Sequence, residues 1–299
     1  MDHTTSQPGI LAAPPPVGRS LSFRMMPSVD AVAAQAALGR LRDGFDLGRG
    51  VAGLGASLVR ALGREVPGLR VFPSLAGPGV DVPSTQAALW LLLRADERGA
   101  LLDATDRVAG LLDGAFVLDD NLDTFVYAGG RDLTGYEDGT ENPKGDAAAE
   151  AALVAGDAGA GLAGSSFVAV QRWVHDLRRF RARTPAECDA VFGRRRDTNE
   201  EIADAAATAH VKRSAQESFD PPAFMLRRSM PWAAGDAQGL EFIAFGESLD
   251  RFERVLRRML GLDDGVVDAL FSFSHPTRGG YYWCPPVAGG RLDLTRLGL

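Results

Sequence analysis

Segments with strand and helix patterns follow one another in the same order in the two halves of this 299-residue chain, and this order limits the folds open to it. In the first half, alternating or continuous apolar runs predict strands, and apolar residues at helical spacing predict helices. The predicted strands are 19–26, 88–94, 115–118 and 124–127, and the predicted helices are 31–42, capped by Asp30, and 96–112. A Gly-rich stretch at 48–55 leads into a further helical piece near Gly63. It matches no phosphate-binding loop, so we interpret it as flexible.

The second half repeats this order of elements without repeating the residues. The predicted strands are 166–174, 223–227, 240–245 and 280–284, and the predicted helices begin at Thr184 and run over 249–260. Glu187 follows Thr184 at the spacing of a capping box. A polar, Gly- and Ala-rich stretch at 129–165 separates the halves and predicts domains over 1–150 and 151–299. We therefore expect an α+β fold of two halves, each an antiparallel sheet covered by helices on one face.

Charge and composition exclude several classes of function. The chain holds 32 Lys and Arg against 39 Asp and Glu, and this net charge of −7 argues against broad binding to nucleic acid. Its two cysteines, Cys188 and Cys284, cannot build a disulfide framework, an all-cysteine zinc site or a cysteine-ligated iron–sulfur cluster. The longest apolar run, 87–93, is far shorter than the ~20 residues of a membrane-spanning helix. No secretory leader pattern begins the chain, so we expect a cytoplasmic protein that binds no membrane.

Two segments carry polar residues in patterns that suit a site. Residues 135–143 are dense in turn formers and carboxylates, and an ordinary Asp-Gly turn is the simplest interpretation. In residues 224–232, strand alternation places Met225, Arg227 and Ser229 on one face. That face is either an exposed sheet edge or the wall of a pocket with a cation in it.

The chain has only four histidines, so any site that needs an imidazole must choose among them. His3 lies in the terminal segment, His175 at the end of a predicted strand, and His275 in a turn before a proline. His210 alone follows a run of small residues, 205–209, which leaves room for a flat and bulky group beside the chain. A lone histidine is more often packed or exposed than a metal ligand, and both interpretations stay open for His210.

Taken together, these segments resemble the dye-decolorizing peroxidases, a family of haem peroxidases. The family motif Gly-x-x-Asp-Gly is present at 135–139 and continues through 140–143 as in bacterial members. The spacings from Asp138 to His210 and from His210 to Arg227 also resemble those of the family, as do three further segments, 7–11, 170–177 and 279–283. The resemblance implies two ferredoxin-like halves with antiparallel sheets flanked by helices, as in dimeric α+β barrels, and one haem b in the second half.

The resemblance also implies a role for each residue around the haem iron. His210 would be the proximal iron ligand, and Asp268 would accept the second N–H of its ring. On the distal side, Asp138 would move the protons of hydrogen peroxide, and Arg227 would stabilise negative charge as the O–O bond breaks. Ser229 stands at the third distal position, which is Asn in one large subgroup of the family and Ser in another.

Further residues are implied at the edge of the haem. Gly139 would let the loop backbone approach the porphyrin, and Thr140 and Asn142 would contact it from the same motif. Arg194, in the basic run 194–196, would pair with a propionate, although a solvated helix face is the simpler interpretation of that run. Several aromatic residues could relay electrons to the surface, but most are expected to pack in the core: Trp173, Trp232, Tyr281, Tyr282 and Trp283.

The resemblance predicts a haem b peroxidase that uses hydrogen peroxide to oxidise dyes or phenolics in one-electron steps through a ferryl intermediate. Two alternatives stay open: a protein that binds haem or releases iron from porphyrin, and a haem-free binding module. Members of the family form dimers and larger rings, so we expect homo-oligomers. Residues 289–299 do not match the tail that directs some members into protein nanocompartments, so we do not expect encapsulation.

Overall fold

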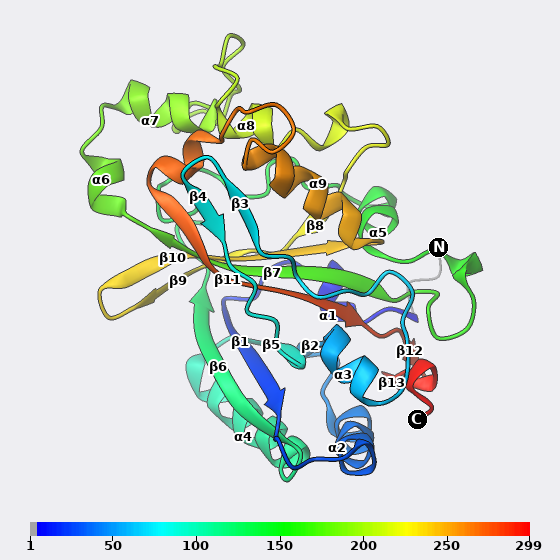
Figure 1. Ribbon diagram of the computed structural model, residues 1–299. Helices are drawn as coiled ribbons and strands as arrows, with labels where there is room; N and C mark the ends of the chain where they lie inside the picture. The colour runs from blue at the N-terminus through cyan, green and yellow to red at the C-terminus, as the bar shows by residue number, and fades with distance from the viewer. Residues whose placement is uncertain (1–4) are drawn as a thin grey trace.

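The computed structural model describes residues 5–299, and an antiparallel sheet of nine strands runs through the middle of this part of the chain (Figure 1). His3 lies outside the described residues. The first half of the chain contributes β1 (Val17–Met25), β2 (Gly50–Leu54), β5 (Leu89–Ala95) and β6 (Phe116–Phe125). The second half contributes β7 (Ser166–His175), β8 (Leu226–Arg227), β9 (Met230–Ala234), β10 (Ala237–Gly246) and β11 (Ser274–Cys284).

The strand order shows two copies of one topology placed side by side. The order is β6-β1-β5-β2 in the first half and β11-β7-β10-β8 in the second, with β9 also paired to β10. If β8 and β9 count as one position, each half has a βαββαβ plan with its first and third strands in the middle, which is the ferredoxin-like arrangement. The predicted α+β fold of two ferredoxin-like halves is thus confirmed.

The first half has the helices α1 (Pro8–Leu11), α2 (Ala31–Gly44), α3 (Ala56–Ala61) and α4 (Arg98–Leu112). The second has α5 (Asp146–Ala152), α6 (Leu177–Arg181), α7 (Pro185–Phe192), α8 (His210–Arg213) and α9 (Leu249–Met259). Helices α2 to α4 of the first half and α6 to α9 of the second gather at opposite ends of the molecule, whereas α1 and α5 contact each other beside the sheet (Figure 1). Two small hairpins and four single-turn helices complete the described chain: β3 (Leu75–Gly77) with β4 (Val80–Val82), β12 (Val287–Ala288) with β13 (Arg291–Leu292), and η2 (Gly156–Ala158), η3 (Gln216–Ser218), η4 (Ala269–Ser272) and η5 (Thr295–Leu297).

The helix ends follow the capping residues read in the sequence. The side chain of Asp30 accepts a hydrogen bond from the Ala33 N–H at 2.8 Å, and α2 begins at the next residue. Thr184 and Glu187 form both hydrogen bonds of a capping box at the start of α7. On α9, Leu249, Phe252, Val255, Leu256 and Met259 are buried on one face. This apolar face of α9 covers the sheet of the second half and forms one wall of the site described below.

The Gly-rich stretch predicted to be flexible is instead a buried strand. All five residues of β2 are buried, and β2 pairs along its whole length with β5. A Cβ atom on Gly53 would lie 2.8 Å from the Cβ of Tyr282 and 3.2 Å from the Trp90 ring. The prediction was wrong because glycine in a strand can mark close packing as well as flexibility.

Two further strand predictions differ from the structure. Segments 115–118 and 124–127 belong to one strand, β6, whose polar middle hid its continuity because its aspartates pair with arginines of other strands. The predicted strand 223–227 is reduced to β8. The residues before β8 bond to Gln216 instead of to the sheet: its carbonyl accepts from the Ala223 N–H, and its side chain accepts from the Met225 N–H.

The two halves meet where β2 lies beside β11, through the pair Leu54 and Trp283. The predicted boundary between residues 150 and 151 falls inside α5, and this division into domains stays a prediction. Among residues 5–299, no helix combines the length and apolar character that crossing a bilayer requires.

Candidate functional site

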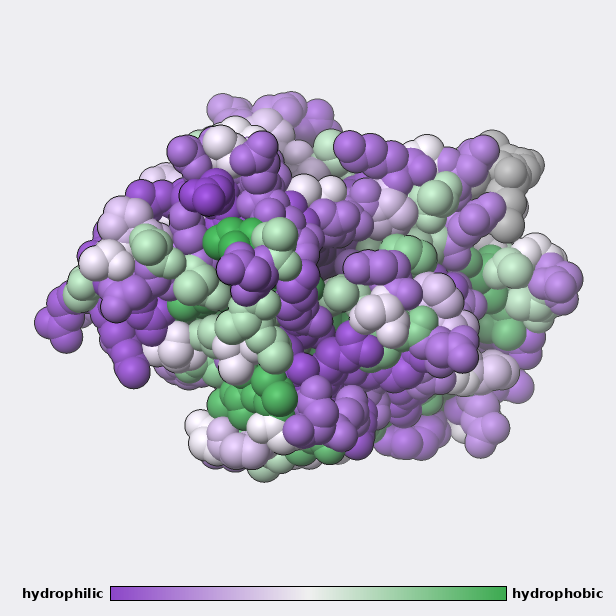
Figure 2. Space-filling view, turned by 90° about the horizontal axis from the view of Figure 1, so that it is seen from above, coloured by the Kyte–Doolittle hydropathy of each residue, from purple (hydrophilic) through white to green (hydrophobic). Residues whose placement is uncertain are grey.

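A deep pocket lies between the sheet of the second half and the helices that cover it. It encloses about 1240 Å³ of space free of protein atoms, including its open mouth. Most of its walls are apolar side chains from β7, β10, α7, α9, η4 and the residue after η4: Trp173, Phe192, Leu240, Phe242, Phe252, Val255, Leu256, Met259, Leu270 and Phe273. Figure 2 shows the face above these helices, where hydrophilic side chains predominate and hydrophobic patches stand among them. Apolar walls with a few polar groups suit a large, mostly apolar ligand. We call this space the main pocket.

His210 lies on one wall of the main pocket, at the start of α8. Its Nδ1 atom is 2.7 Å from Oδ2 of Asp268, whose side chain is fully buried. The other oxygen of Asp268 accepts the Leu270 N–H at 2.8 Å, and this bond fixes the carboxylate as the cap of η4. A carboxylate accepts from Nδ1–H, which leaves Nε2 with its lone pair free to bind a metal. The structure thus brings His210 and Asp268 together as the resemblance implied.

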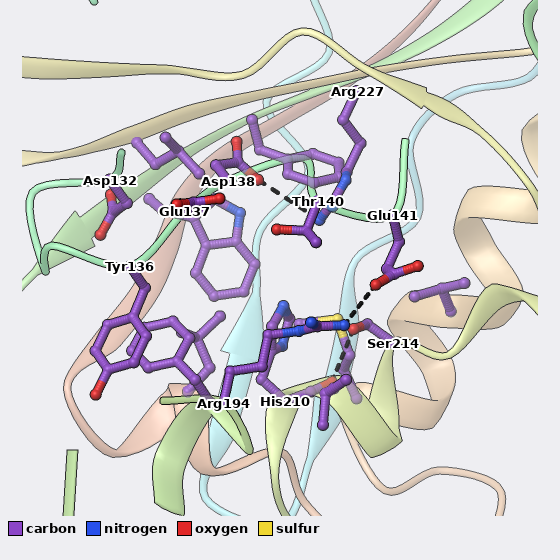
Figure 3. Close-up of a pocket in the computed structure, with 18 of the residues that line it drawn as sticks. Asp132, Tyr136, Glu137, Asp138, Thr140, Glu141, Arg194, His210, Ser214 and Arg227 are labelled. Carbon is purple, nitrogen blue, oxygen red and sulfur yellow. Dashed lines mark hydrogen bonds and ion pairs between the residues drawn. The ribbon is translucent and has the colours of Figure 1, made fainter. Parts of the chain in front are cut away.

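Asp138 and Arg227 lie on the wall opposite His210 (Figure 3). A guanidinium nitrogen of Arg227 is 3.6 Å from Oδ1 of Asp138, and both side chains are largely buried, 16% and 23% exposed. Asp138 comes from the loop before α5, and Arg227 comes from β8. A base and a fixed cation therefore face the imidazole across an apolar gap, an arrangement that can move a proton and stabilise negative charge on a ligand between them.

Gly139, Asn142 and Ser229 do not line the main pocket. They lie along a second cavity, which Asp138 and Arg227 also line and which Tyr127, Arg131 and Arg228 help to enclose. Asn142 fixes the backbone of Arg227: its Oδ1 accepts the Arg227 N–H at 2.8 Å, and its Nδ2 donates to the Arg227 carbonyl at 3.0 Å. Ser229 Oγ accepts the Ile243 N–H at 3.3 Å. Asp138 and Arg227 thus separate the two spaces.

Gly139 makes the tight turn between the motif and Asn142. Its φ is +78°, and a Cβ atom there would lie 2.6 Å from the amide nitrogen of Asn142. Glycine adopts this backbone conformation without strain. In the structure, Gly139 therefore provides room for Asn142, whereas the sequence suggested that it provides room for a ligand.

Thr140 and Arg194 lie at the mouth of the main pocket, where two loops bond to each other. Arg194 pairs with Glu141 and donates to the Asn199 carbonyl at 3.0 Å. The side chain of Asn199 in turn donates to Thr140 Oγ1 and to Glu137, each at 2.9 Å. Arg194 is the cation of its basic run that lines the main pocket, which places it where an anionic group of a ligand could replace Glu141.

A buried hydrogen-bond network in the pocket wall was not predicted. Nε2 of His175 is 3.1 Å from Asp132, and its Nδ1 is 2.7 Å from Ser274 Oγ. Burial would raise the pKa of Asp132, but hydrogen bonds from His175 and Thr134 outweigh it and hold that pKa below its ordinary value. In the sequence, His175 is recognisable only as a residue at the end of a predicted strand, and Asp132 lies outside the motif. Only the fold brings the two together.

A second unpredicted pair is Tyr136 with Asp189. Tyr136 is the second residue of the Gly-x-x-Asp-Gly motif, lines the main pocket and donates its hydroxyl hydrogen bond to Asp189 of α7. The motif drew attention to its glycines and its aspartate, and the variable position between them carried no signal of its own.

Comparison with known proteins gives one family. The family model described as "Dyp-type peroxidase, C-terminal" matches residues 129–289, more than half of the chain. A relative from Mycolicibacterium paratuberculosis, named dye-decolorizing peroxidase, is 32% identical over 225 residues, which are 73% of this chain. The matched segment spans only 63% of that relative's length.

Solved structures of similar proteins cover nearly the whole chain. A putative Dyp-type peroxidase protein from Shewanella oneidensis is 25% identical with a TM-score of 0.87, over 94% of this chain and 96% of the other. A variant of DypB from Rhodococcus jostii RHA1, solved in complex with heme, is 27% identical with a TM-score of 0.82, over 92% and 94%. The similarity therefore extends to both halves of the sheet and to the pocket between sheet and helices.

Proposed function

Since the chain belongs to the dye-decolorizing peroxidase family, we propose that it binds haem b in the main pocket and uses hydrogen peroxide to oxidise small organic donors. The observation that carries this proposal is the pairing of His210 and Asp268 on one wall with Asp138 and Arg227 on the wall opposite. Each donor molecule loses one electron, so one peroxide serves two donors. Homo-oligomers and a cytoplasmic location remain predictions from the sequence.

The residues of the main pocket fit a haem. His210 presents Nε2 because Asp268 holds Nδ1, and a single neutral imidazole is the usual proximal ligand of haem iron in peroxidases. The apolar side chains of β10 and α9 match the faces of a porphyrin, and Arg194 at the mouth offers a charged partner for a propionate. When bound, haem supplies an iron centre that takes up the oxidising equivalents of peroxide and passes them on one at a time.

On the distal side, Asp138 and Arg227 have different roles in the reaction with peroxide. Asp138 would take a proton from one oxygen of the peroxide and return it to the other oxygen, which would leave as water. Arg227 stays charged and stabilises the negative charge that develops as the O–O bond breaks. Asn142 holds the Arg227 backbone in place through two hydrogen bonds. The pair therefore acts from a fixed position.

The second cavity gives the peroxide a route to this pair. Asp138 and Arg227 line both spaces, so a small polar molecule in the second cavity already contacts the base and the cation. Ser229 lies along this route, and its hydroxyl hydrogen is free to bond to water or peroxide there because Oγ acts as an acceptor toward Ile243. In this proposal Ser229 guides the peroxide and does not contact the haem.

Haem reconstitution of wild type and three variants tests the proposal. We expect wild type to gain a Soret band that His210→Ala lacks. We expect Asp138→Ala and Arg227→Ala to keep the band but to react with peroxide about 10²- to 10⁴-fold more slowly in stopped flow. If both variants react as fast as wild type, the assigned roles are wrong. Release of iron-free protoporphyrin from bound haem would instead identify a haem-handling protein.

A further inference from the structure

Tyr136 lies where it could exchange an electron with a group bound in the main pocket. Its ring is 4% exposed and lines the pocket, and it stacks on Phe192 with ring centroids 4.0 Å apart and planes 19° from parallel. Phe192 in turn lies edge-on to His210, with centroids 6.4 Å apart. A continuous path of ring contacts therefore joins His210 to Tyr136 (Figure 3 shows both residues at the pocket wall).

The hydroxyl of Tyr136 has a carboxylate partner that can accept its proton. The O–H donates to Oδ1 of Asp189, which also accepts the backbone N–H of Arg196 at 3.2 Å. Within residues 5–299, no side-chain nitrogen of Lys, Arg or His forms an ion pair with the Asp189 carboxylate, so its charge is not neutralised in that way. Burial, followed by the hydrogen bond to Asp189, raises the pKa of Tyr136, so the phenol keeps its proton in the resting protein. Asp189 itself is half-buried on α7, which brings this pair to the molecular surface.

The other aromatic residues near the pocket lack such a partner. The hydroxyl of Tyr281 reaches Glu253 only at 3.4 Å, and Arg70 both pairs with that carboxylate and lies over the Tyr281 ring. A cation over the ring opposes removal of an electron from it. Trp173 lines the pocket, but its buried indole N–H has no hydrogen-bond partner among the described residues.

We propose that Tyr136 is a redox-active residue that carries oxidising equivalents from the haem toward donor molecules at the surface, with Asp189 as its proton acceptor. This inference rests on the proposed function. In the first step, Tyr136 gives one electron to the peroxide-oxidised haem, and its O–H bond breaks as the proton moves to the Asp189 carboxylate. The product is a neutral tyrosyl radical. In the second step, a donor gives one electron to that radical, the proton returns from Asp189, and the donor leaves oxidised by one electron.

Electron paramagnetic resonance on haem-loaded protein, frozen shortly after addition of peroxide, tests the assignment. The chain has four tyrosines, so growth on ring-deuterated tyrosine distinguishes a tyrosyl from a tryptophanyl radical by the narrowing of its signal. We expect a tyrosyl signal in wild type, its loss in Tyr136→Phe, and its retention in the matched control Tyr282→Phe. Tyr282 lies in the core against Trp90, outside the main pocket.

A second variant tests the proton acceptor. Asp189→Asn can still accept a hydrogen bond from Tyr136 but cannot take up its proton at neutral pH. We expect it to lose most of the tyrosyl signal while keeping the wild-type Soret band, thermal unfolding midpoint and rate of the first reaction with peroxide. A signal of wild-type size in either Tyr136→Phe or Asp189→Asn overturns the inference.

The outcomes separate this inference from the proposed function. If wild type binds haem and reacts with peroxide but its radical is a tryptophanyl, or is unchanged in Tyr136→Phe, the role of Tyr136 is wrong and the peroxidase stands. If wild type binds no haem, or peroxide leaves its spectrum unchanged, the proposed function fails and the role of Tyr136 fails with it.

Discussion

At the scale of single residues, the most specific feature of the site is the hydrogen bond between the His210 ring and one buried carboxylate, that of Asp268. Asp268 has no exposed surface, and its two oxygens are each committed, one to the imidazole and one to the Leu270 N–H. The carboxylate therefore fixes both the orientation of the ring and the nitrogen that faces the pocket.

Replacement of that carboxylate should weaken haem binding without removing it. We expect Asp268→Asn to lower haem affinity about 10- to 100-fold, because a partner of a metal-bound histidine usually contributes that much. Titration with haem, followed by the Soret band, measures the effect. Asp263→Asn, an exposed aspartate on the same loop, serves as the matched control and should bind like wild type. Equal affinities for wild type and Asp268→Asn would contradict the role given to this contact.

Asp132 should contribute to stability in a pH-dependent way. Its pKa in the folded protein is lowered, from an unfolded value of about 3.9. Its contribution is therefore complete above the unfolded pKa and is lost as the pH falls through the folded pKa. We expect Asp132→Asn to lower the free energy of unfolding by about 1–3 kcal/mol at pH 7, since it disturbs the bonds to His175 and Thr134.

Urea unfolding of wild type and Asp132→Asn at pH 7 and at pH 3 measures this dependence. The difference in free energy between the two proteins should shrink at the lower pH, because wild-type Asp132 then begins to bind a proton as well. A difference that stays constant, or grows as the pH falls, would show that the Asp132 carboxylate is not stabilised by the fold.

At the scale of elements, β8 is short, and hydrogen bonds from a loop supplement its pairing in the sheet. Its two residues pair with only two residues of β10. Asn142 lies in a loop 85 positions away in the sequence. Its side-chain amide hydrogen-bonds to both the N–H and the carbonyl of Arg227, as the backbone of a neighbouring strand would. The loop that carries Asp138 thus also holds the backbone of Arg227 in position, through Asn142. The positions of the two distal residues therefore depend on each other.

Asn142→Ala should therefore impair the reaction more than haem binding. We expect it to leave the Arg227 N–H without its partner and the Arg227 carbonyl with the Arg228 guanidinium alone, at a cost of about 1–3 kcal/mol in stability. The haem-loaded variant should also react with peroxide more slowly, as the guanidinium loses its fixed place. Stopped flow and urea unfolding measure the two effects, with Asn121→Ala on the exposed face of β6 as the control. If Asn142→Ala reacted with peroxide as fast as wild type, the role given to Asn142 in positioning Arg227 would be wrong.

Local patterns predicted the long elements well and the site only in part. Capping residues and apolar periodicity located α2, α7 and α9, because those signals act within a few residues. The alternation around Arg227 placed Ser229 on the same face, yet the strand ends at Arg227, and Ser229 lines only the second cavity whereas Arg227 lines both. The partners Asp132 with His175 and Tyr136 with Asp189 come from segments 43 and 53 positions apart, and no local pattern relates them.

At the scale of the whole molecule, the two halves use the same topology for different purposes. In the first half, side chains of α2 and α4 such as Leu38, Leu41, Leu101 and Leu112 fill the space over the sheet. In the second half, the corresponding space between the sheet and the helices is the main pocket. The first half therefore has a filled core where the second half has the main pocket, and the two halves are joined at the edges of β2 and β11.

The packing of glycine at this junction gives a prediction on stability. We expect Gly53→Ala to lower the free energy of unfolding by about 1–3 kcal/mol, because its methyl group would overlap Tyr282 and Trp90 where β2 lies near β11. Gly110→Ala on α4 is the matched control, since a Cβ atom there meets nothing within 4 Å. It should stabilise the protein by about 0.5–1 kcal/mol. Chemical unfolding decides the outcome, and a neutral Gly53→Ala would contradict the close packing of the junction.

The place of β11 in the sheet has a consequence for the order of assembly. β11 lies between β2 and β7, so it is the strand that turns two separate sheets into one, yet it follows every other strand of that sheet in the sequence. During synthesis the first half can complete its four strands early, as N-terminal units generally do. The second half must wait for β11, and so must the covering of the exposed edges of β2 and β7. The ribosome therefore releases the strand that unites the sheet after all the others, and until then the nascent chain carries two open sheet edges that another chain could pair with.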